Sequence, residues 1–170
     1  MNPQTQHAVR QLIAALEAEM GHAHRILILL REQSRALLAA DVIRVAEIER
    51  EVREVMRKRQ AIERERAEAA IQVTRCLQLE NGIAQTIAPL TAVARRLPRP
   101  EAARLLSVRA RLIGLHSDIA ATTAANRPMI EMALQFIQVS LEAVARAVAR
   151  PAGYGPRRAG APNLLIDQRV

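Results

Sequence analysis

The chain has 170 residues, half of them hydrophobic, with a formal net charge of +8 and a sequence pI near 11.3. Aromatic residues make up only 1% of it (Phe136 and Tyr154), and Cys76 is the single cysteine. This composition argues against a β-sandwich or barrel and excludes an internal disulfide. A core of Leu, Ile, Val, Ala and Met predicts an all-α protein built by close packing of helices.

The first long helix is predicted over residues 5–40. Its apolar side chains recur every seven residues, with a second set between them, a pattern typical of coiled-coil packing. The seam contains Val9, Leu16, Ala23, Leu30 and Leu37. Asp41 then separates two apolar runs and is predicted to cap a second helix. We therefore expect a reversal near residues 39–42 and an antiparallel hairpin; one continuous helix is the alternative.

The second long helix is predicted over residues 42–79. Its seam contains Val45, Ile48, Val52, Val55, Ile62 and Ala69. The remaining surface, within EIEREVREVMRKRQAIERERAE, mixes acidic and basic side chains, which is typical of a solvated helix face. A nucleic-acid-binding surface over residues 50–66 is the alternative. It is disfavoured because the basic residues, all Arg except Lys58, are spread along the chain, and because aromatic platforms for base stacking are almost absent.

Asn81-Gly82 is predicted to end the second helix, because glycine readily adopts the left-handed conformation of a C-terminal cap. A shorter helix is predicted over residues 83–97, before a break at Pro98 and Pro100. The third long helix is predicted from Glu101 to Ala149, with a seam of Leu105, Leu112 and Ile119.

Pro128 interrupts this third helix. Because proline lacks an N–H and clashes with the preceding turn, a kink or a new helix start is expected there. In the second case, Asn126 would cap the restarted helix.

After Pro128 the predicted helix carries two apolar stripes. At roughly 100° per residue, the first stripe is Ile130, Leu134, Ile137, Leu141, Val144 and Val148. The second stripe is Met129, Met132, Phe136, Val139, Ala143 and Ala147. A helix that packs once needs only one stripe. We expect the first stripe to hold the bundle together and the second to dock another helix; burial of both stripes in the same fold is the alternative.

The complete fold predicted is an elongated antiparallel bundle of three long helices plus a short helix, with a flexible C-terminal tail. The bundle is expected to form one domain over residues 1–150. Residues 151–170 are too rich in Gly and Pro to fold alone. They contain Tyr154 and end in an apolar cluster, Leu164, Leu165 and Ile166.

The sequence contains no recognisable catalytic or cofactor site. His22 and His24 are two residues apart, so on a helix they point in different directions and do not share a metal. There is no glycine-rich phosphate loop, no secretory signal and no apolar run long enough to span a bilayer. We therefore expect a cytoplasmic protein that is not an enzyme and binds no cofactor.

Several segments resemble those of FlgN-type flagellar export chaperones of bacterial type III secretion. They are RALLAADVIRVAEIE, KRQAIERERAE, ANRPMIEMALQFIQVSL, GYGPRRAG and the terminal LLIDQRV. The resemblance implies a cytosolic chaperone without enzymatic activity. It would bind the C-terminal helical segments of the hook-associated (hook–filament junction) proteins and present them to the flagellar export gate.

Helical phase, rather than the resemblance, places the cargo-binding face on the second stripe. The residues assigned to it are Met129, Met132, Phe136, Val139 and Ala143. Tyr154 and Leu164–Ile166 are further candidates for a gate or cargo contact. Two other functions stay open at this point: a basic helical nucleic-acid-binding protein, and a structural homodimeric coiled coil.

Overall fold

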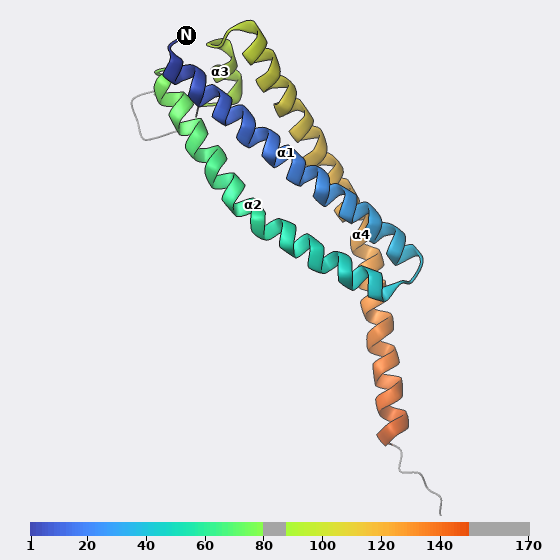
Figure 1. The fold of residues 1–170 in the computed structure, drawn as a ribbon. Coiled ribbons are helices and arrows are strands. Elements are labelled where there is room, and N and C mark those ends of the chain that lie inside the picture. Colours follow the sequence, from blue (N-terminus) through green and yellow to red (C-terminus); the bar gives the residue numbers. More distant parts are fainter. Residues whose placement is uncertain (80–87, 150–170) are drawn as a thin grey trace, which may run out of the picture. The chain divides into compact units, whose positions relative to one another are not determined.

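The computed structural model describes residues 1–79 and 88–149, and in these two ranges it contains four helices and no strand (Figure 1). The helices are α1 (Pro3–Leu38), α2 (Val42–Cys76), α3 (Leu90–Arg95) and α4 (Arg99–Ala149). The prediction of an all-α protein with three long helices and one short helix is confirmed.

The chain divides into two compact units, Met1–Ala133 and Leu134–Val170. The boundary predicted at residue 150 stays a prediction, because residues 150–170 lie outside the described part. Helix α4 contributes residues to both units.

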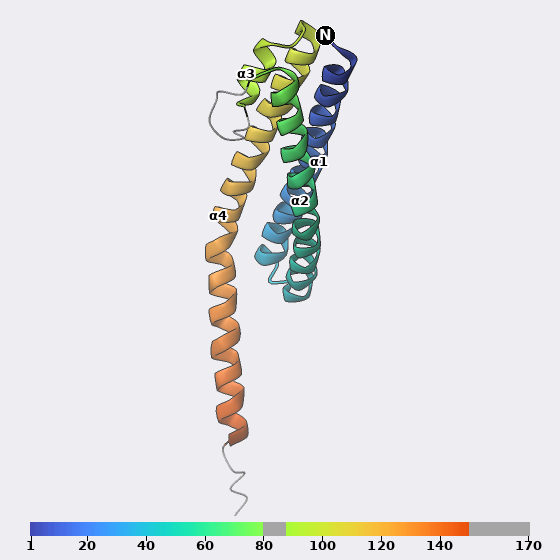
Figure 2. The same ribbon diagram turned by 90° about the vertical axis from the view of Figure 1, so that its left-hand side faces the viewer.

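Helices α1 and α2 form the expected antiparallel hairpin and lie side by side in both views (Figures 1 and 2). Asp41 caps α2 as predicted, because its side-chain oxygen accepts a hydrogen bond of 2.9 Å from the backbone N–H of Arg44. Two ion pairs join the helices, Arg25 with Glu51 at 2.7 Å and Arg44 with Glu32 at 2.9 Å. The reversal at residues 39–41 is therefore fixed by local capping and by contacts along the hairpin.

Both hairpin helices end in a turn that places a non-glycine residue in the left-handed region. Ala40 follows α1 with φ of 54°, and Gln78 follows α2 with φ of 51°. After α1, the backbone N–H groups of Ala40 and Asp41 donate to the carbonyls of Leu37 and Ala36. After α2, the N–H groups of Gln78 and Leu79 donate in the same way to Arg75 and Thr74. The predicted end of α2 at Asn81-Gly82 is wrong, because this capping turn stops the helix at Cys76.

Ala40→Gly is expected to raise the free energy of unfolding by about 1 kcal/mol, because glycine adopts the left-handed conformation without the steric penalty of a Cβ. Chemical denaturation of the two proteins measures this difference. Ala39→Gly is the matched control: Ala39 has φ of −83°, so the added chain entropy should make that variant less stable. Equal destabilisation by both changes would contradict the account of this turn.

The larger apolar cluster of the first unit draws on all four helices. Its buried members in α1 and α2 are Ala8, Val9, Leu12, Ile13, Leu16, Ala69, Ala70 and Val73; Ala88, Val93, Ala94, Leu105, Val108 and Leu112 complete it. Only Val93 and Ala94 come from the short helix α3. This end of the bundle therefore has a conventional aliphatic core around the start of α4.

The smaller apolar cluster lies toward the hairpin turn and has members only from α1 and α2. Leu29, Ala36 and Ile48 are buried, and Val45, Val52 and Val55 pack against them. The heptad seams are thus confirmed, although several of their members, including Leu30, Leu37 and Ile119, are only half-buried.

Helix α4 runs parallel to α1 and antiparallel to α2. Arg104 pairs with Glu17 at 2.8 Å, and Arg31 lies 3.6 Å from Asp118, so the residue order along the two helices is the same. This up-down-up order requires a second reversal after α2. The helix predicted over residues 83–97 is shorter in the described part, Leu90–Arg95, with Pro89 at its N-cap. Residues 80–87 and the Asn81-Gly82 pair lie outside the description.

Candidate functional site

Helix α4 passes through Pro128 without ending. It runs for 51 residues from Arg99 to Ala149, so the predicted new helix start is wrong. Pro128 still removes the N–H that would bond to the carbonyl of Ala124. The helix persists because good helix formers, chiefly Ala, Met, Leu, Glu and Gln, surround this position.

Asn126 does not act as a helix cap. Its side chain is 1% exposed and points to α1, where Nδ2 donates to the backbone oxygen of Leu30 and to Oε1 of Gln33, both at 2.9 Å. Its Oδ1 accepts a hydrogen bond from Oγ of Ser34. Gln33, itself 2% exposed, donates from Nε2 to Glu49 of α2. Asn126, Gln33, Ser34 and Glu49 form what we call the polar node, which joins three helices.

The second stripe is mostly exposed. Phe136 is 73% exposed, Met132 68% and Val139 56%; Ala143 is also exposed, and Met129 is half-buried. Large apolar side chains in such an environment are typical of a surface that binds a partner. The assignment of cargo contacts to these residues stays a prediction, because no partner is present.

The first stripe is exposed as well, and the prediction that it is buried in the bundle is wrong for four residues. Leu134, Leu141, Val144 and Val148 are between 60% and 79% exposed, while Ile130 and Ile137 are half-buried. These four residues belong to the second unit, whose described part is the end of a single helix. That unit has no second described helix of its own against which the stripe could pack.

The polar face of the last part of α4 is held by contacts within the helix. Arg127 donates to Glu131 at 2.9 Å, Gln138 donates to Glu142 at 3.3 Å, and Arg146 lies 3.6 Å from Glu142. The hydrogen bond to Glu131 raises the pKa of Arg127 above its ordinary value. These side chains therefore form a narrow charged border between wide apolar surfaces.

Several basic side chains on the Arg-rich surface of α2 form ion pairs with Glu. Arg57 lies 2.7 Å from Glu54, Arg59 lies 2.7 Å from Glu63, and Arg66 lies 3.1 Å from Glu19 of α1. Within the described part, this pairing disfavours the nucleic-acid interface that residues 50–66 suggested. It supports the interpretation of a solvated helix face.

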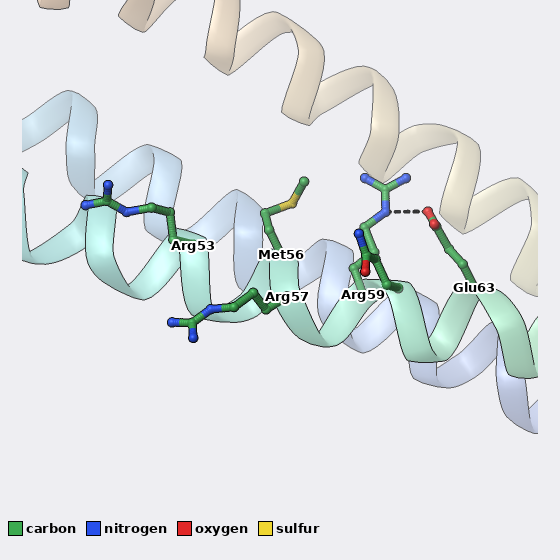
Figure 3. A pocket seen from close by; sticks show the side chains of 6 residues that line it. Arg53, Met56, Arg57, Arg59 and Glu63 are labelled. Atoms are coloured by element: carbon green, nitrogen blue, oxygen red, sulfur yellow. Dashed lines mark hydrogen bonds and ion pairs between the residues drawn. The ribbon is translucent and has the colours of Figure 1, made fainter.

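A surface hollow lies along the same part of α2, lined by Arg53, Met56, Arg57, Arg59, Gln60 and Glu63. Figure 3 shows that the labelled side chains all come from one helix, with Arg59 bonded to Glu63. A ligand site usually gathers groups from several elements around an enclosed apolar space. This hollow lacks that arrangement, so we assign it no ligand.

Among residues 1–79 and 88–149, no group of three His, Cys, Asp or Glu side chains is placed to hold a metal ion. Within the same ranges, none of the helices combines the length and hydropathy needed to cross a membrane. The candidate contacts Tyr154, Leu164, Leu165 and Ile166 lie outside the described residues.

The polar node is the feature that sequence reasoning missed. A signal for it was present: Asn126 occupies the same helical face as the first stripe, where an apolar residue would be expected. Gln33 and Ser34 likewise stand in the Leu-rich first helix. A polar residue in an apolar seam indicates a buried hydrogen-bonding partner.

The model of a protein family described as FlgN protein matches residues 1–160, which is most of the chain. Searches of curated proteins and of solved structures give no match. The chain therefore belongs to the FlgN family, a family of flagellar export chaperones.

Proposed function

We propose that this chain is a cytosolic chaperone that binds the C-terminal helical segments of hook-associated proteins and delivers them to the flagellar export gate. One observation carries the proposal: α4 exposes a series of large apolar side chains between Met132 and Val148. Family membership gives the broader role in flagellar export, and this surface supports the choice of partner. An amphipathic cargo helix would cover apolar area that is otherwise in contact with water.

The second stripe has the chemistry for such a contact. Burying a side chain such as Met132, Phe136 or Val139 contributes roughly 1.5–3 kcal/mol each before the costs of association. Methionine at positions 129 and 132 adapts easily to different neighbours, which suits a surface that accepts more than one cargo. A complex of micromolar affinity corresponds to about −8 kcal/mol and is within reach of this surface together with the apolar face of the cargo.

Delivery requires a second contact, with the export gate. We assign it to Tyr154, Leu164, Leu165 and Ile166, an apolar cluster and an aromatic residue near the C-terminus. This assignment leaves the second stripe available to hold cargo while the gate is engaged.

The alternatives make different predictions about salt. A nucleic-acid complex neutralises phosphates and weakens steeply as salt rises. A complex through the second stripe is mainly apolar and should be far less sensitive. A structural homodimer through the same stripe would form without cargo, and added cargo would not dissociate it.

A secretion assay in the flagellated host tests the proposal. A strain that lacks this protein should release much less hook-associated protein into the medium, while other flagellar subunits are still exported. The wild-type chain should restore export, and a chain with Phe136→Asp should not. Ile43→Asp is the matched control, because Ile43 is 75% exposed but belongs to α2 and is not part of the stripe. Full export in the strain that lacks the protein would contradict the proposal.

A further inference from the structure

Helix α4 is attached to the hairpin in two chemically different ways. At its start, Leu105, Val108 and Leu112 enter the larger apolar cluster. Between residues 113 and 133, Asn126 is the one side chain of α4 that is fully buried. The smaller apolar cluster, which packs α1 against α2 toward the hairpin turn, has no member from α4. Toward the hairpin turn, the polar node therefore supplies the one fully buried contact of α4, beside the exposed Arg31–Asp118 ion pair and half-buried apolar residues such as Ile119.

Within the polar node, each hydrogen-bonding group of the Asn126 side chain has a partner. Both N–H groups of the Asn126 amide have acceptors, and its oxygen has a donor in Ser34. Gln33 uses its oxygen for Asn126 and its nitrogen for Glu49. Such a network tolerates few other arrangements, because a buried donor or acceptor left without a partner costs roughly 1–3 kcal/mol.

The apolar seam of α4 defines the register of this helix on the hairpin less strictly than the polar node does. Leu105, Leu112 and Ile119 repeat every seven residues, so a shift by seven brings a similar side chain to the same place. The same shift would put Ile119 or Ala133 opposite Gln33 and Ser34. Neither side chain can form the hydrogen bonds of Asn126. A shift of α4 by seven residues would therefore keep the apolar contacts of the seam but lose the hydrogen bonds of the polar node.

Helical phase connects the polar node to the exposed stripes. At 100° per residue, the first stripe is centred roughly 40° from Asn126, and the cargo-assigned residues are centred roughly 100° to the other side. Because Met129 and Met132 of the second stripe lie in the same unit as Asn126, the rotation that turns Asn126 toward α1 also determines the direction in which these two residues face.

We propose that Asn126, through its bonds to Ser34, Gln33 and Leu30, is the positioning residue that fixes the register and rotation of α4 on the hairpin. A buried asparagine has this effect in coiled coils, where it selects one register at a cost in stability. The geometric part of the proposal is independent of the proposed function. Its consequence for cargo binding rests on that function.

Asn126→Leu tests the register directly. Spin labels at the exposed positions Arg10 of α1 and Ala121 of α4, in a Cys76→Ser background, report the offset of the two helices by pulsed electron paramagnetic resonance. The unsubstituted node should give one narrow distance distribution. Asn126→Leu should keep or raise Tm but broaden the distribution, with added populations displaced by about 5 Å per helical turn. Thr123→Leu, an exposed change on the same helix, should leave it narrow.

Two further results decide the proposal if Asn126→Leu does not fold. Ser34→Ala removes the hydroxyl that lies within hydrogen-bond distance of the Asn126 oxygen and of the Leu30 carbonyl, but keeps Asn126 itself, so it should fold and broaden the same distribution more weakly. One narrow, unchanged distribution in every folded node variant would overturn the proposal. A broadened distance distribution in a node variant, together with an unchanged narrow distribution in Thr123→Leu, would support the proposal.

Cargo affinity separates this proposal from the function on which it partly rests. Asn126→Leu should weaken binding of a hook-associated C-terminal segment about tenfold, whereas Phe136→Asp should remove binding with an unchanged distance distribution. If the wild-type chain binds no such segment while Asn126→Leu still broadens the distances, the proposed function fails and the positioning role stands. Unchanged distances overturn the positioning role, whatever the affinity.

Discussion

Phe136→Asp is expected to weaken the binding of a hook-associated C-terminal segment by at least about 100-fold and to leave Tm within a few degrees of wild type. Phe136 is 73% exposed in the free chain, so a charge there remains hydrated and costs the fold little. In a complex the same carboxylate would be buried without a partner, and the apolar contact of the ring would be lost. Calorimetric titration measures the first effect, and thermal melting followed by circular dichroism measures the second.

Two matched variants show whether the loss of binding is specific to the second stripe. Ile43→Asp introduces the same charge at a position of similar exposure on α2 and should bind cargo normally. Leu141→Asp introduces it on the first stripe, at 64% exposure, and compares the two stripes directly. Loss of binding in Leu141→Asp but not in Phe136→Asp would show that the stripes have been exchanged. Unfolding of Phe136→Asp would place that residue in a core.

Leu105→Ala is expected to lower the free energy of unfolding by about 2–5 kcal/mol, the usual range for removing a fully buried leucine side chain. Leu105 is 0% exposed and belongs to the cluster in which α4 meets α1, α2 and α3. The void left there has few ways to collapse, because residues from four helices surround it. Urea denaturation followed by circular dichroism gives the difference.

Leu106→Ala is the control at the neighbouring position. Leu106 is 40% exposed, so the same substitution removes less buried area and should cost under about 1 kcal/mol. Equal effects of the two variants would contradict the placement of the start of α4 against the larger apolar cluster.

The regular parts of this fold were predictable because their physics is local and periodic. The seven-residue spacing of Val9, Leu16 and Ala23 identified buried positions, and all three are buried. Asp41 was recognised as a cap because a short acidic side chain between two apolar runs satisfies the first N–H groups of a helix. Neither inference needed knowledge of distant contacts.

The helix ends were harder to predict because the chain departs from common preferences there. Ala40 and Gln78 occupy positions where glycine is usual, so the glycine of Asn81-Gly82 predicts an end of α2 that is too late. Pro128 predicts a kink or a new helix start, yet α4 continues through it. In each case, the favourable energetic contributions of many neighbouring residues outweigh the cost of one unfavourable residue.

The candidate site could be located from sequence only in part. The excess of apolar surface after Pro128 was visible, and the exposure of Met132, Phe136 and Val139 agrees with a free face. The exposure of the first stripe was not predictable, because helical phase does not show that its four exposed members belong to a separate unit without a second described helix. The burial of Asn126 depends on Gln33 and Ser34, which lie more than ninety residues away in the sequence.

The most direct test of the account is a titration of the full chain with a purified C-terminal segment of a hook-associated protein at low and at high salt. The account predicts saturable binding at micromolar Kd, with a change of no more than about threefold for a tenfold rise in salt, since the contact is mainly apolar. Absence of binding at low salt, or affinity that falls by orders of magnitude as salt rises, would contradict the claim that α4 holds cargo through its second stripe.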